Sequence, residues 1–493
     1  MAGNFKSDDS FLRKLIIGSS GVNSTISKLK ELGFNPIELE RGSTGFKIWK
    51  KIKIKRIRVP DILCLNTGLR FESRGKTKLE ISMSHSLNDP KRAWDFEMRD
   101  DDMVTIVTFE QNEIDPINVK QVSPIHFVTV KDMRDAFKKK QIVISKPKGF
   151  EEGSEIRVIW PSAFANCKSQ IVNISQDKIK MEPITSFGKK QSIQLSRNKG
   201  KIVLSPYVKI NESIEENQIV ASVIPVTLNV SCPKTVKEAY FVDKLSSVNL
   251  SERYAAAKAL RYRGYSSTTK KIIQNRMNDN EEDIYVKLEA AAALAINNDV
   301  KAWEFLENKL HSPIMTVPLE TQLETIIVSS ELADKKSESL LIDVLQDHSR
   351  DTELRAGAAW ALGQFSTKKT AQALVDTFDL NDSYVKHEAA RALLRIGDEQ
   401  KDYLLSLIKS NSINKRDGIS WVLARIGDFD PNLLLSEPDE NLRKWISYIL
   451  GYGKDFFDET YINKICQSDP EIYFAASVLW QILHSWINNL SEY

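Results

Sequence analysis

The pattern of apolar and polar positions predicts a helical start to the chain. Apolar residues recur at helical spacing through "FLRKLII" and again through "VNSTISKLKEL", with glycines between the two stretches and after the second. Recurrence at every third or fourth position is typical of a helix with one buried face, and glycine commonly follows a helix end. We therefore expect two helices within residues 7–33.

From residue 34 the apolar period changes to two, which is typical of strands with one buried face. "NPIELERG" is a short strand of this kind and "LRFESRGKTKLEIS" alternates clearly, whereas "DILCL" and "MVTIVTF" (103–109) are apolar runs that fit buried strands. Pro90 opens "PKRAWDFEMRD", and proline suits the first turn of a helix. The order predicted for residues 7–109 is helix, three strands, helix and strand.

Residues 116–240 lack helical periodicity over most of their length. The stretches "SEIRVIW", "SQIVNI", "GKIVLS" and "NQIVASVIPVTLNV" predict strands separated by polar turns. We expect a compact β-barrel or sandwich here.

The chain repeats itself from about residue 241. Seven stretches, among them "KLEAAAALAINND", "LRAGAAWALGQF" and "KHEAARALLRIGD", align on one leucine, at Leu260, Leu294, Leu362, Leu393, Leu423, Leu450 and Leu479. The period of 27–34 residues predicts about eight helical pairs that bury their apolar faces only by stacking. Gly397 and Gly427 are expected to end helices in a left-handed turn. These stretches resemble the HEAT-like repeats first recognised in bilin lyases. The resemblance implies a solenoid fold, but it does not imply lyase activity.

Charge and cysteine content narrow the range of partners. The formal net charge of +3 divides into +5 for residues 1–110, +7 for residues 111–240 and −9 for residues 241–493. A polyanion such as DNA should therefore meet residues 1–240. The four cysteines lie far apart without a CxxC pair, which indicates reduced thiols in a cytosolic, cytoplasmic protein and excludes a zinc finger. No apolar run is long enough to span a bilayer, so no membrane contact is expected.

Two acids flank the predicted turn between "DILCL" and "LRFESRGKTKLEIS". Asp61 follows Pro60, and Glu72 lies eleven positions further on. If the two strands are antiparallel, both acids lie side by side near one end of the sheet. Residues two apart on a strand share a face, so Glu72, Arg74, Lys76 and Lys78 should point one way, and Phe71, Leu79 and Ile81 the other way, toward a core.

The pair Pro60-Asp61, the acid Glu72 and the element order resemble the PD-(D/E)XK, or restriction-endonuclease-like, nuclease superfamily. The resemblance implies a Mg²⁺ or Mn²⁺ ion held by Asp61 and Glu72, with Glu40 as an additional ligand. The final lysine of the motif is replaced by Arg74, which can hold a phosphate but transfers protons poorly. Lys76 would then orient the water, after a strand bulge at Gly75.

The resulting fold class is multidomain, with α/β, β and α parts. Residues 1–115 are expected to form the nuclease-like α/β core, residues 116–240 the β-barrel or sandwich, and residues 241–493 the HEAT-like α-solenoid. The function this predicts is a metal-dependent endonuclease for restriction, phage defence or repair. DNA would contact a basic run and the neighbouring strand through Lys50, Lys53, Lys55, Arg56, Arg58 and Lys78, and the acidic solenoid would bind a protein partner or a second copy of the chain.

The acids, the basic run and the N-terminal helices also allow other interpretations. The two acids could belong to an ordinary charged hairpin, and the basic run could be a lysine-coated edge strand. A winged helix would use residues 22–32 for recognition, but it accounts for neither acid. His85 among Ser82, Ser84 and Ser86 lacks a GxSxG elbow, and no Walker loop is present. The rival function is a non-catalytic DNA-binding adaptor, with Arg74 marking a lost active site.

Overall fold

The computed structural model describes residues 9–39, 57–111, 119–145, 155–184, 188–408 and 412–426, with the single residues 438 and 449. Glu40, Lys50, Lys53, Lys55 and Arg56 lie outside the described residues, as do Leu450 and Leu479. The chain divides into two compact units. The first contains residues 1–47 and 56–293, and the second contains residues 48–55 and 294–493.

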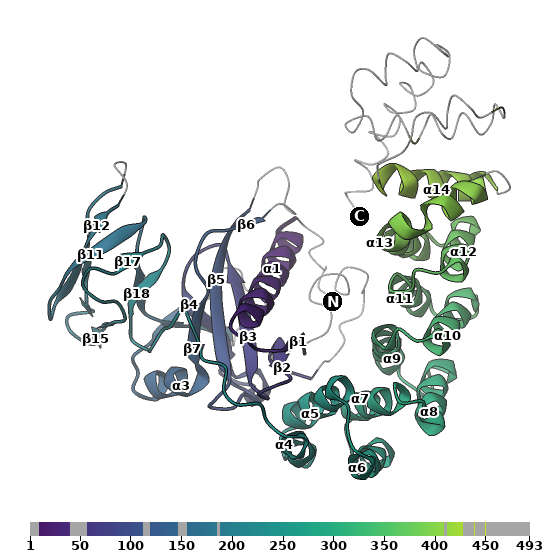
Figure 1. The fold of residues 1–493 in the computed structure, drawn as a ribbon, viewed down its shortest axis with the longest axis horizontal. Helices are drawn as coiled ribbons and strands as arrows, with labels where there is room; N and C mark the ends of the chain where they lie inside the picture. The colour runs from purple at the N-terminus through teal and green to yellow at the C-terminus, as the bar shows by residue number, and fades with distance from the viewer. Residues whose placement is uncertain are drawn as a thin grey trace. The chain divides into compact units, whose positions relative to one another are not determined.

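A six-stranded mixed sheet is the framework of the first unit (Figure 1). Its strands follow the order β1-β2-β3-β5-β6, and β7 also pairs with β5. The first three strands are antiparallel, whereas β3 and β5 run parallel without a register shift. The strands are β1 (Pro36–Glu38), β2 (Ile62–Cys64), β3 (Arg70–Lys76), β5 (Met103–Gln111), β6 (Val119–Gln121) and β7 (His126–Thr129).

One long helix, α1 (Asp9–Glu31), packs on this sheet, so the prediction of two helices in residues 7–33 is wrong. The helix continues through Gly18 and Gly21, and the chain turns at Gly33, where φ is +85°. On its buried side, the Thr25 hydroxyl lies 3.2 Å from that of Ser73 on β3. The winged-helix interpretation fails as well, because residues 22–32 are the second half of this packed helix.

Two glycines allow α1 to approach β3 closely. A Cβ atom on Gly21 would lie 2.8 Å from the Gly75 Cα, and one on Gly75 would lie 2.2 Å from the Ile17 carbonyl oxygen. Real Cβ atoms do not approach backbone atoms so closely, so each glycine leaves the space that the other element occupies. The predicted bulge at Gly75 is wrong, because β3 pairs with β5 in unbroken register from Phe71 to Lys76.

The crossover from β3 to β5 contains a strand and, where a helix is expected from residue 90, only a short helical turn. Pro90 begins only a short 3-10 helix, η1 (Pro90–Arg92), and the strand β4 precedes it. A second sheet has the order β4-β9-β8. Its members and the helix beside them are β4 (Ile81–Ser86), β8 (Val143–Ser145), β9 (Glu155–Trp160) and α3 (Val130–Lys138), whose first turn is capped by Thr129.

The sheet of β3 and β5 has a separate core on each face. One core joins α1 to Phe71 and Val107, and the other joins Val104 to α3 and the second sheet. Leu79 and Ile81 belong to the second core. The expectation that they share a face with Phe71 is therefore wrong, because the chain turns after β3 and crosses to the other side.

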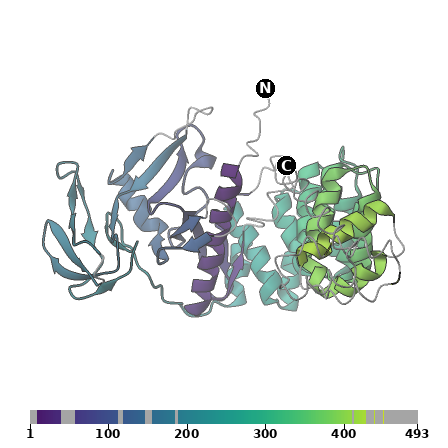
Figure 2. The same cartoon turned by 90° about the horizontal axis from the view of Figure 1, so that it is seen from above.

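Residues 162–222 form a small β region beside these sheets (Figure 2). Its sheets have the orders β10-β18-β16 and β13-β12-β11-β17, with β14 and β15 as a separate pair around one core. The pairing of β5 with β6 and β7 crosses the boundary expected at residue 115. The strands are β10 (Ser162–Phe164), β11 (Ser169–Ile174), β12 (Lys178–Pro183), β13 (Gln191–Gln194), β14 (Ser196–Arg197), β15 (Ile202–Val203), β16 (Ser205–Pro206), β17 (Ser213–Ile214) and β18 (Ile219–Ser222).

Helices make up the rest of the described chain. The first unit ends with α4 (Glu238–Lys244), α5 (Leu250–Arg263), α6 (Ser267–Asn278) and α7 (Ile284–Ala295). The second unit contains α8 (Val300–His311), α9 (Leu319–Leu332), α10 (Lys335–Gln346), α11 (Thr352–Leu362), α12 (Lys368–Asp376), η2 (Thr377–Asp379), α13 (Ser383–Ile408) and α14 (Ile413–Ile426).

The second unit stacks its helices in two layers, with α9, α11 and α13 in one and α8, α10 and α12 in the other (Figure 1). The aligned leucines within the described residues are at most 1% exposed, as the repeat alignment predicts. The helix end expected at Gly397 is wrong, because α13 continues through it. Gly397 instead makes room for Ile426, whose Cδ1 atom would lie 2.1 Å from a Cβ there. Gly427 lies outside the described residues.

The contact between α1 and β3 predicts opposite effects of alanine at two glycines. Gly75→Ala should lower the free energy of unfolding by about 1–3 kcal/mol, the usual cost of overpacking. Gly18→Ala is the matched control, because nothing lies within 4 Å of its Cβ position, and it should stabilise α1 by about 0.5–1 kcal/mol. Urea unfolding of the full chain measures both changes. Equal changes in the unfolding free energy of Gly75→Ala and Gly18→Ala would show that the contact between α1 and β3 does not require glycine at position 75.

Candidate functional site

The register of β2 and β3 brings Asp61 and Glu72 together. Ile62 pairs with Phe71 and Leu63 with Arg70, so one further step places Asp61 opposite Glu72. Directly paired residues of antiparallel strands share a face. Glu72 therefore lies on the face of β3 that points away from α1, and Asp61 comes directly before the paired part of β2.

The backbone of β3 holds the Asp61 side chain. The backbone N–H of Ser73 donates a hydrogen bond of 2.7 Å to the Asp61 Oδ2 atom. The Asp61 carbonyl oxygen accepts another, also of 2.7 Å, from the backbone N–H of Leu39. Asp61 is thus held by hydrogen bonds from β3 and from the residue that follows β1.

Glu72 and Arg74 form an ion pair in which the Glu72 Oε1 and Arg74 Nη2 atoms lie 2.5 Å apart. The Glu72 side chain is 15% exposed and that of Arg74 is 37% exposed. The predicted alternation along β3 holds for both, because Phe71, Ser73 and Gly75 pack on the side of α1. The guanidinium therefore lies against the carboxylate that was expected to bind a metal ion.

Lys76 lies further along the same face and is held by β4. Its Nζ atom donates to the hydroxyl of Ser82 at 2.6 Å and to the Ser82 carbonyl at 3.1 Å. Burial lowers the pKa of Lys76 from 10.5 to about 7, Arg157 and Arg74 lower it too, and Glu80 opposes the shift. Burial and the neighbouring cations thus favour the neutral form of this amine.

Two further residues of the predicted site, Arg58 and Lys78, are also described by the structure. Arg58, from the end of the basic run, donates from Nη1 to the Lys91 carbonyl at 3.2 Å. Burial lowers the pKa of Arg58, and the charges of Arg74 and Arg92 add to this effect while Glu72 and Asp95 oppose it. Lys78 is exposed beyond the end of β3.

Carboxylate oxygens are suitable ligands for a magnesium or manganese ion. No group of three or more His, Cys, Asp or Glu side chains with metal-binding geometry occurs among the described residues. Magnesium nevertheless needs only one or two carboxylates when waters and substrate phosphates complete its shell. Asp61 and Glu72 are the pair of oxygen ligands that the sequence predicts.

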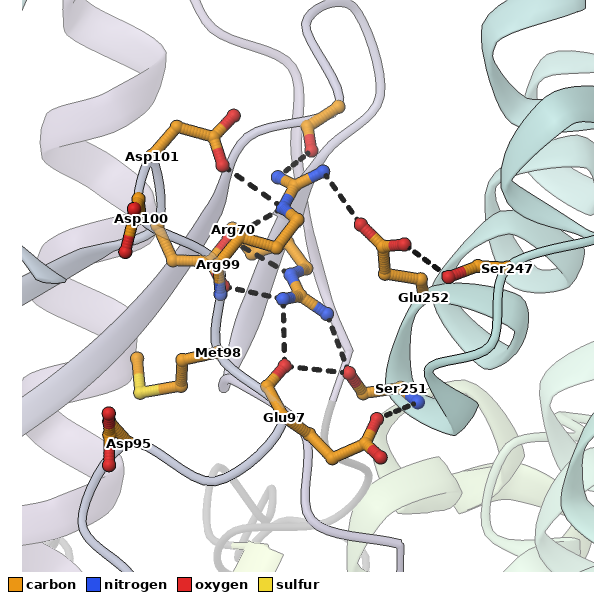
Figure 3. A network of polar contacts seen from close by, with 12 residues as sticks. Arg70, Asp95, Glu97, Met98, Arg99, Asp100, Asp101, Ser247, Ser251 and Glu252 are labelled. Carbon is orange, nitrogen blue, oxygen red and sulfur yellow. Dashed lines mark hydrogen bonds and ion pairs between the residues drawn. The ribbon is translucent and has the colours of Figure 1, made fainter. Parts of the chain in front are cut away.

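The first charged residue of this face, Arg70, is buried and structural (Figure 3). Its Nε and Nη2 atoms donate to the two carboxylate oxygens of Asp102 at 3.0 and 2.5 Å. Its Nη1 atom donates to the Ser251 hydroxyl on α5 at 2.9 Å. The Glu97 carbonyl oxygen accepts from Arg70 Nη2 at 3.1 Å, and its carboxylate accepts from the Ser251 backbone N–H at 2.8 Å.

A second arginine extends this network. Arg99 donates to Asp102 at 3.2 Å and lies 3.8 Å from Glu252 on α5 (Figure 3). It also donates to the Tyr240 hydroxyl at 2.6 Å. Local sequence patterns do not reveal this network, because hydrogen-bonded partners in it lie up to 181 positions apart. The signal that could have indicated it is Arg70 within an otherwise apolar strand start, where a charge needs a buried partner.

Other features that the sequence singled out have structural roles. His85 accepts from the backbone N–H of Trp94 at 3.3 Å and packs against Phe137. Cys64, Cys167 and Cys232 are free thiols. Within the described part of the chain, the helices are too short or too polar to cross a membrane.

Comparison with known proteins supports the helical repeats. Residues 320–394 match the family model described as HEAT repeats, which confirms the repeat prediction for that part of the chain. The match does not extend to residues 1–115, whose nuclease resemblance stays a prediction. No curated protein shows a sequence match to the chain.

Two solved structures illustrate the similarity. The complex of CpcE and CpcF of phycocyanin lyase from Nostoc sp. PCC7120 is 19% identical, covers 51% of this chain and 97% of its own, and has a TM-score of 0.25. Human deoxyhypusine hydroxylase in complex with glycerol is 16% identical, covers 50% of this chain and 84% of its own, and has a TM-score of 0.18. TM-scores this low do not support any conclusion about the function of this chain.

The buried network predicts a large loss of stability when one partner is neutralised. Asp102→Asn should lower the free energy of unfolding by about 3–5 kcal/mol, because it leaves the Arg70 charge buried without a carboxylate. Lys190→Gln removes a surface ion pair with Glu182 and should cost less than about 1 kcal/mol. Thermal unfolding of the full chain compares them. Equal losses would mean that the network contributes no more than a surface pair.

Proposed function

We propose that the first unit hydrolyses phosphodiester bonds of nucleic acid with the help of Mg²⁺ or Mn²⁺. The observation that supports the proposal is the pairing of Ile62 with Phe71, because Asp61 comes one residue before the first and Glu72 one residue after the second. Two arginines and a lysine with a low pKa lie along or beside this face, so anionic substrate and hydrolytic water would meet suitable groups.

Each residue has a separate task in this proposal. The carboxylates of Asp61 and Glu72 would hold the ion, which when bound polarises the phosphate and acidifies a water molecule. Arg74 would leave Glu72 when the substrate binds and donate to phosphate oxygens, a geometry that suits a guanidinium. Lys76 would accept the proton of the attacking water, which a guanidinium cannot do.

The helical repeats would supply protein contacts rather than chemistry. Stacked repeats form extended surfaces that commonly bind other proteins. The net charge of −9 in residues 241–493 disfavours DNA as their ligand. We therefore infer that a partner protein or a second copy of the chain binds there, in a defence or repair setting.

A specific observation favours the rival function of a DNA-binding adaptor. The ion pair between Glu72 and Arg74 occupies one of the two expected ligands with a cation. If this pair persists with substrate, the face would bind phosphate without cleaving it. An adaptor would therefore bind DNA with a steep salt dependence and show no cleavage with any divalent ion.

Cleavage of plasmid DNA with Mg²⁺ or Mn²⁺ separates these two functions. Asp61→Ala and Glu72→Ala should each reduce the cleavage rate at least about a hundredfold, roughly 2.7 kcal/mol in activation free energy. Glu110→Ala is the matched control, since Glu110 is an exposed acid on β5. Cleavage that survives both site substitutions would contradict the proposal, and binding by the wild type without any cleavage would establish the adaptor.

A further inference from the structure

The amine of Lys76 is fixed by a single residue of another strand. Both of its hydrogen-bond acceptors, a hydroxyl and a carbonyl oxygen, belong to Ser82 on β4. Ser82 is 5% exposed, and Lys76 is the last residue of the β3 ladder, so neither can shift without breaking strand pairing. The position of the amine is thus set by β3 and β4 together.

The charges around this amine are mainly positive. Arg157, on β9, donates from Nε to the same Ser82 hydroxyl at 2.9 Å. Arg74 adds a second positive charge from β3. The one acid that acts on Lys76, Glu80, is ion-paired with Arg157 at 2.8 Å, and within the described chain no carboxylate lies within 4 Å of the Lys76 amine.

Such surroundings favour the neutral amine. Burial and neighbouring cations both destabilise an ammonium ion. A neutral amine can accept a proton, and a base titrating near neutral pH is well matched to proton transfer. Arg74, at the motif position, stays protonated and cannot take this role.

We propose that Ser82 is a positioning residue that holds the Lys76 amine, and that Arg157 and Glu80 set its protonation, so that Lys76 acts as the proton acceptor of the reaction. This inference rests on the proposed hydrolytic function. In the step itself, the water oxygen forms a bond to phosphorus and gives its proton to the Lys76 Nζ atom. The bond from phosphorus to the leaving oxygen breaks, and that oxygen takes a proton from solvent.

The first test measures the amine without requiring any cleavage. Trace acylation of the full chain with acetic anhydride between pH 5 and 10, read by mass spectrometry, gives the pH at which Lys76 is half reactive. The exposed Lys78 serves as an internal reference for reagent concentration. In the wild type the midpoint should lie near 7.

Two substitutions should move this midpoint in opposite directions. Arg157→Gln removes a neighbouring cation and should raise the midpoint by roughly half a unit to one unit. Glu80→Gln removes the acid and should lower it by a similar amount. Both side chains are partly exposed, so folding should be retained. If the acylation midpoint of Lys76 is the same in the wild type, Arg157→Gln and Glu80→Gln, the inference is overturned, whatever the cleavage assay shows.

The second test asks whether the amine serves the reaction. The cleavage rate should fall as pH decreases through about 7, because a protonated amine cannot accept a proton. The midpoint of this fall should move up in Arg157→Gln and down in Glu80→Gln, in step with the acylation midpoints. Ser82→Ala should lower kcat with little change in KM, and Ser82→Thr, which keeps the hydroxyl, should restore it.

The two measurements separate the possible failures. Shifted acylation midpoints with an unshifted cleavage profile would show that Arg157 and Glu80 control the protonation of the Lys76 amine. They would also show that Lys76 is not the proton acceptor, which overturns the inference. A loss of kcat in Ser82→Ala that Ser82→Thr does not reverse would also overturn it. The Asp61→Ala and Glu72→Ala variants alone decide the proposed function.

Discussion

The alternation of side chains along β3 is the constraint on which the first unit depends. Phe71, Ser73 and Gly75 face α1, and the residues between them face the second sheet. The unbroken pairing with β5 prevents any residue from changing sides, because a shift by one position would move every side chain to the opposite face. The close approach of α1, which Gly21 and Gly75 allow, holds this register from one side. The chemistry of the other face follows from it.

The buried charges at the start of β3 hold the same register from the other side. Arg70 and Asp102 are almost wholly inaccessible to solvent, so their charges are tolerated only with each other and with the hydrogen bonds of Ser251 and Glu97. A slip of β3 would leave these charges unpaired in an apolar setting. The network also ties α5 to the sheet. The first helices of the solenoid half are therefore part of the unit that carries the candidate site.

Local patterns made part of this structure predictable from sequence. Alternating stretches located β1 and β3, apolar runs located β2 and β5, and the leucine alignment located the solenoid core. Two of the failures involve contacts between distant segments. The strand β4 finds its partner in β9 more than 70 positions away, and the role of Gly75 depends on α1. Neither contact can be predicted from the spacing of apolar residues along the sequence.

The lysine of the candidate site shows why such distant contacts matter for function. Arg74 and Lys76 share a face, and sequence alone suggested that a bulge would bring the lysine into the motif position. The straight ladder instead keeps Lys76 two residues along, where Ser82 and Arg157 fix and partly neutralise it. Phosphate binding and proton transfer are then assigned to different residues. A guanidinium is suited to the first task and a low-pKa amine to the second, so the arginine in the motif does not by itself indicate a lost activity.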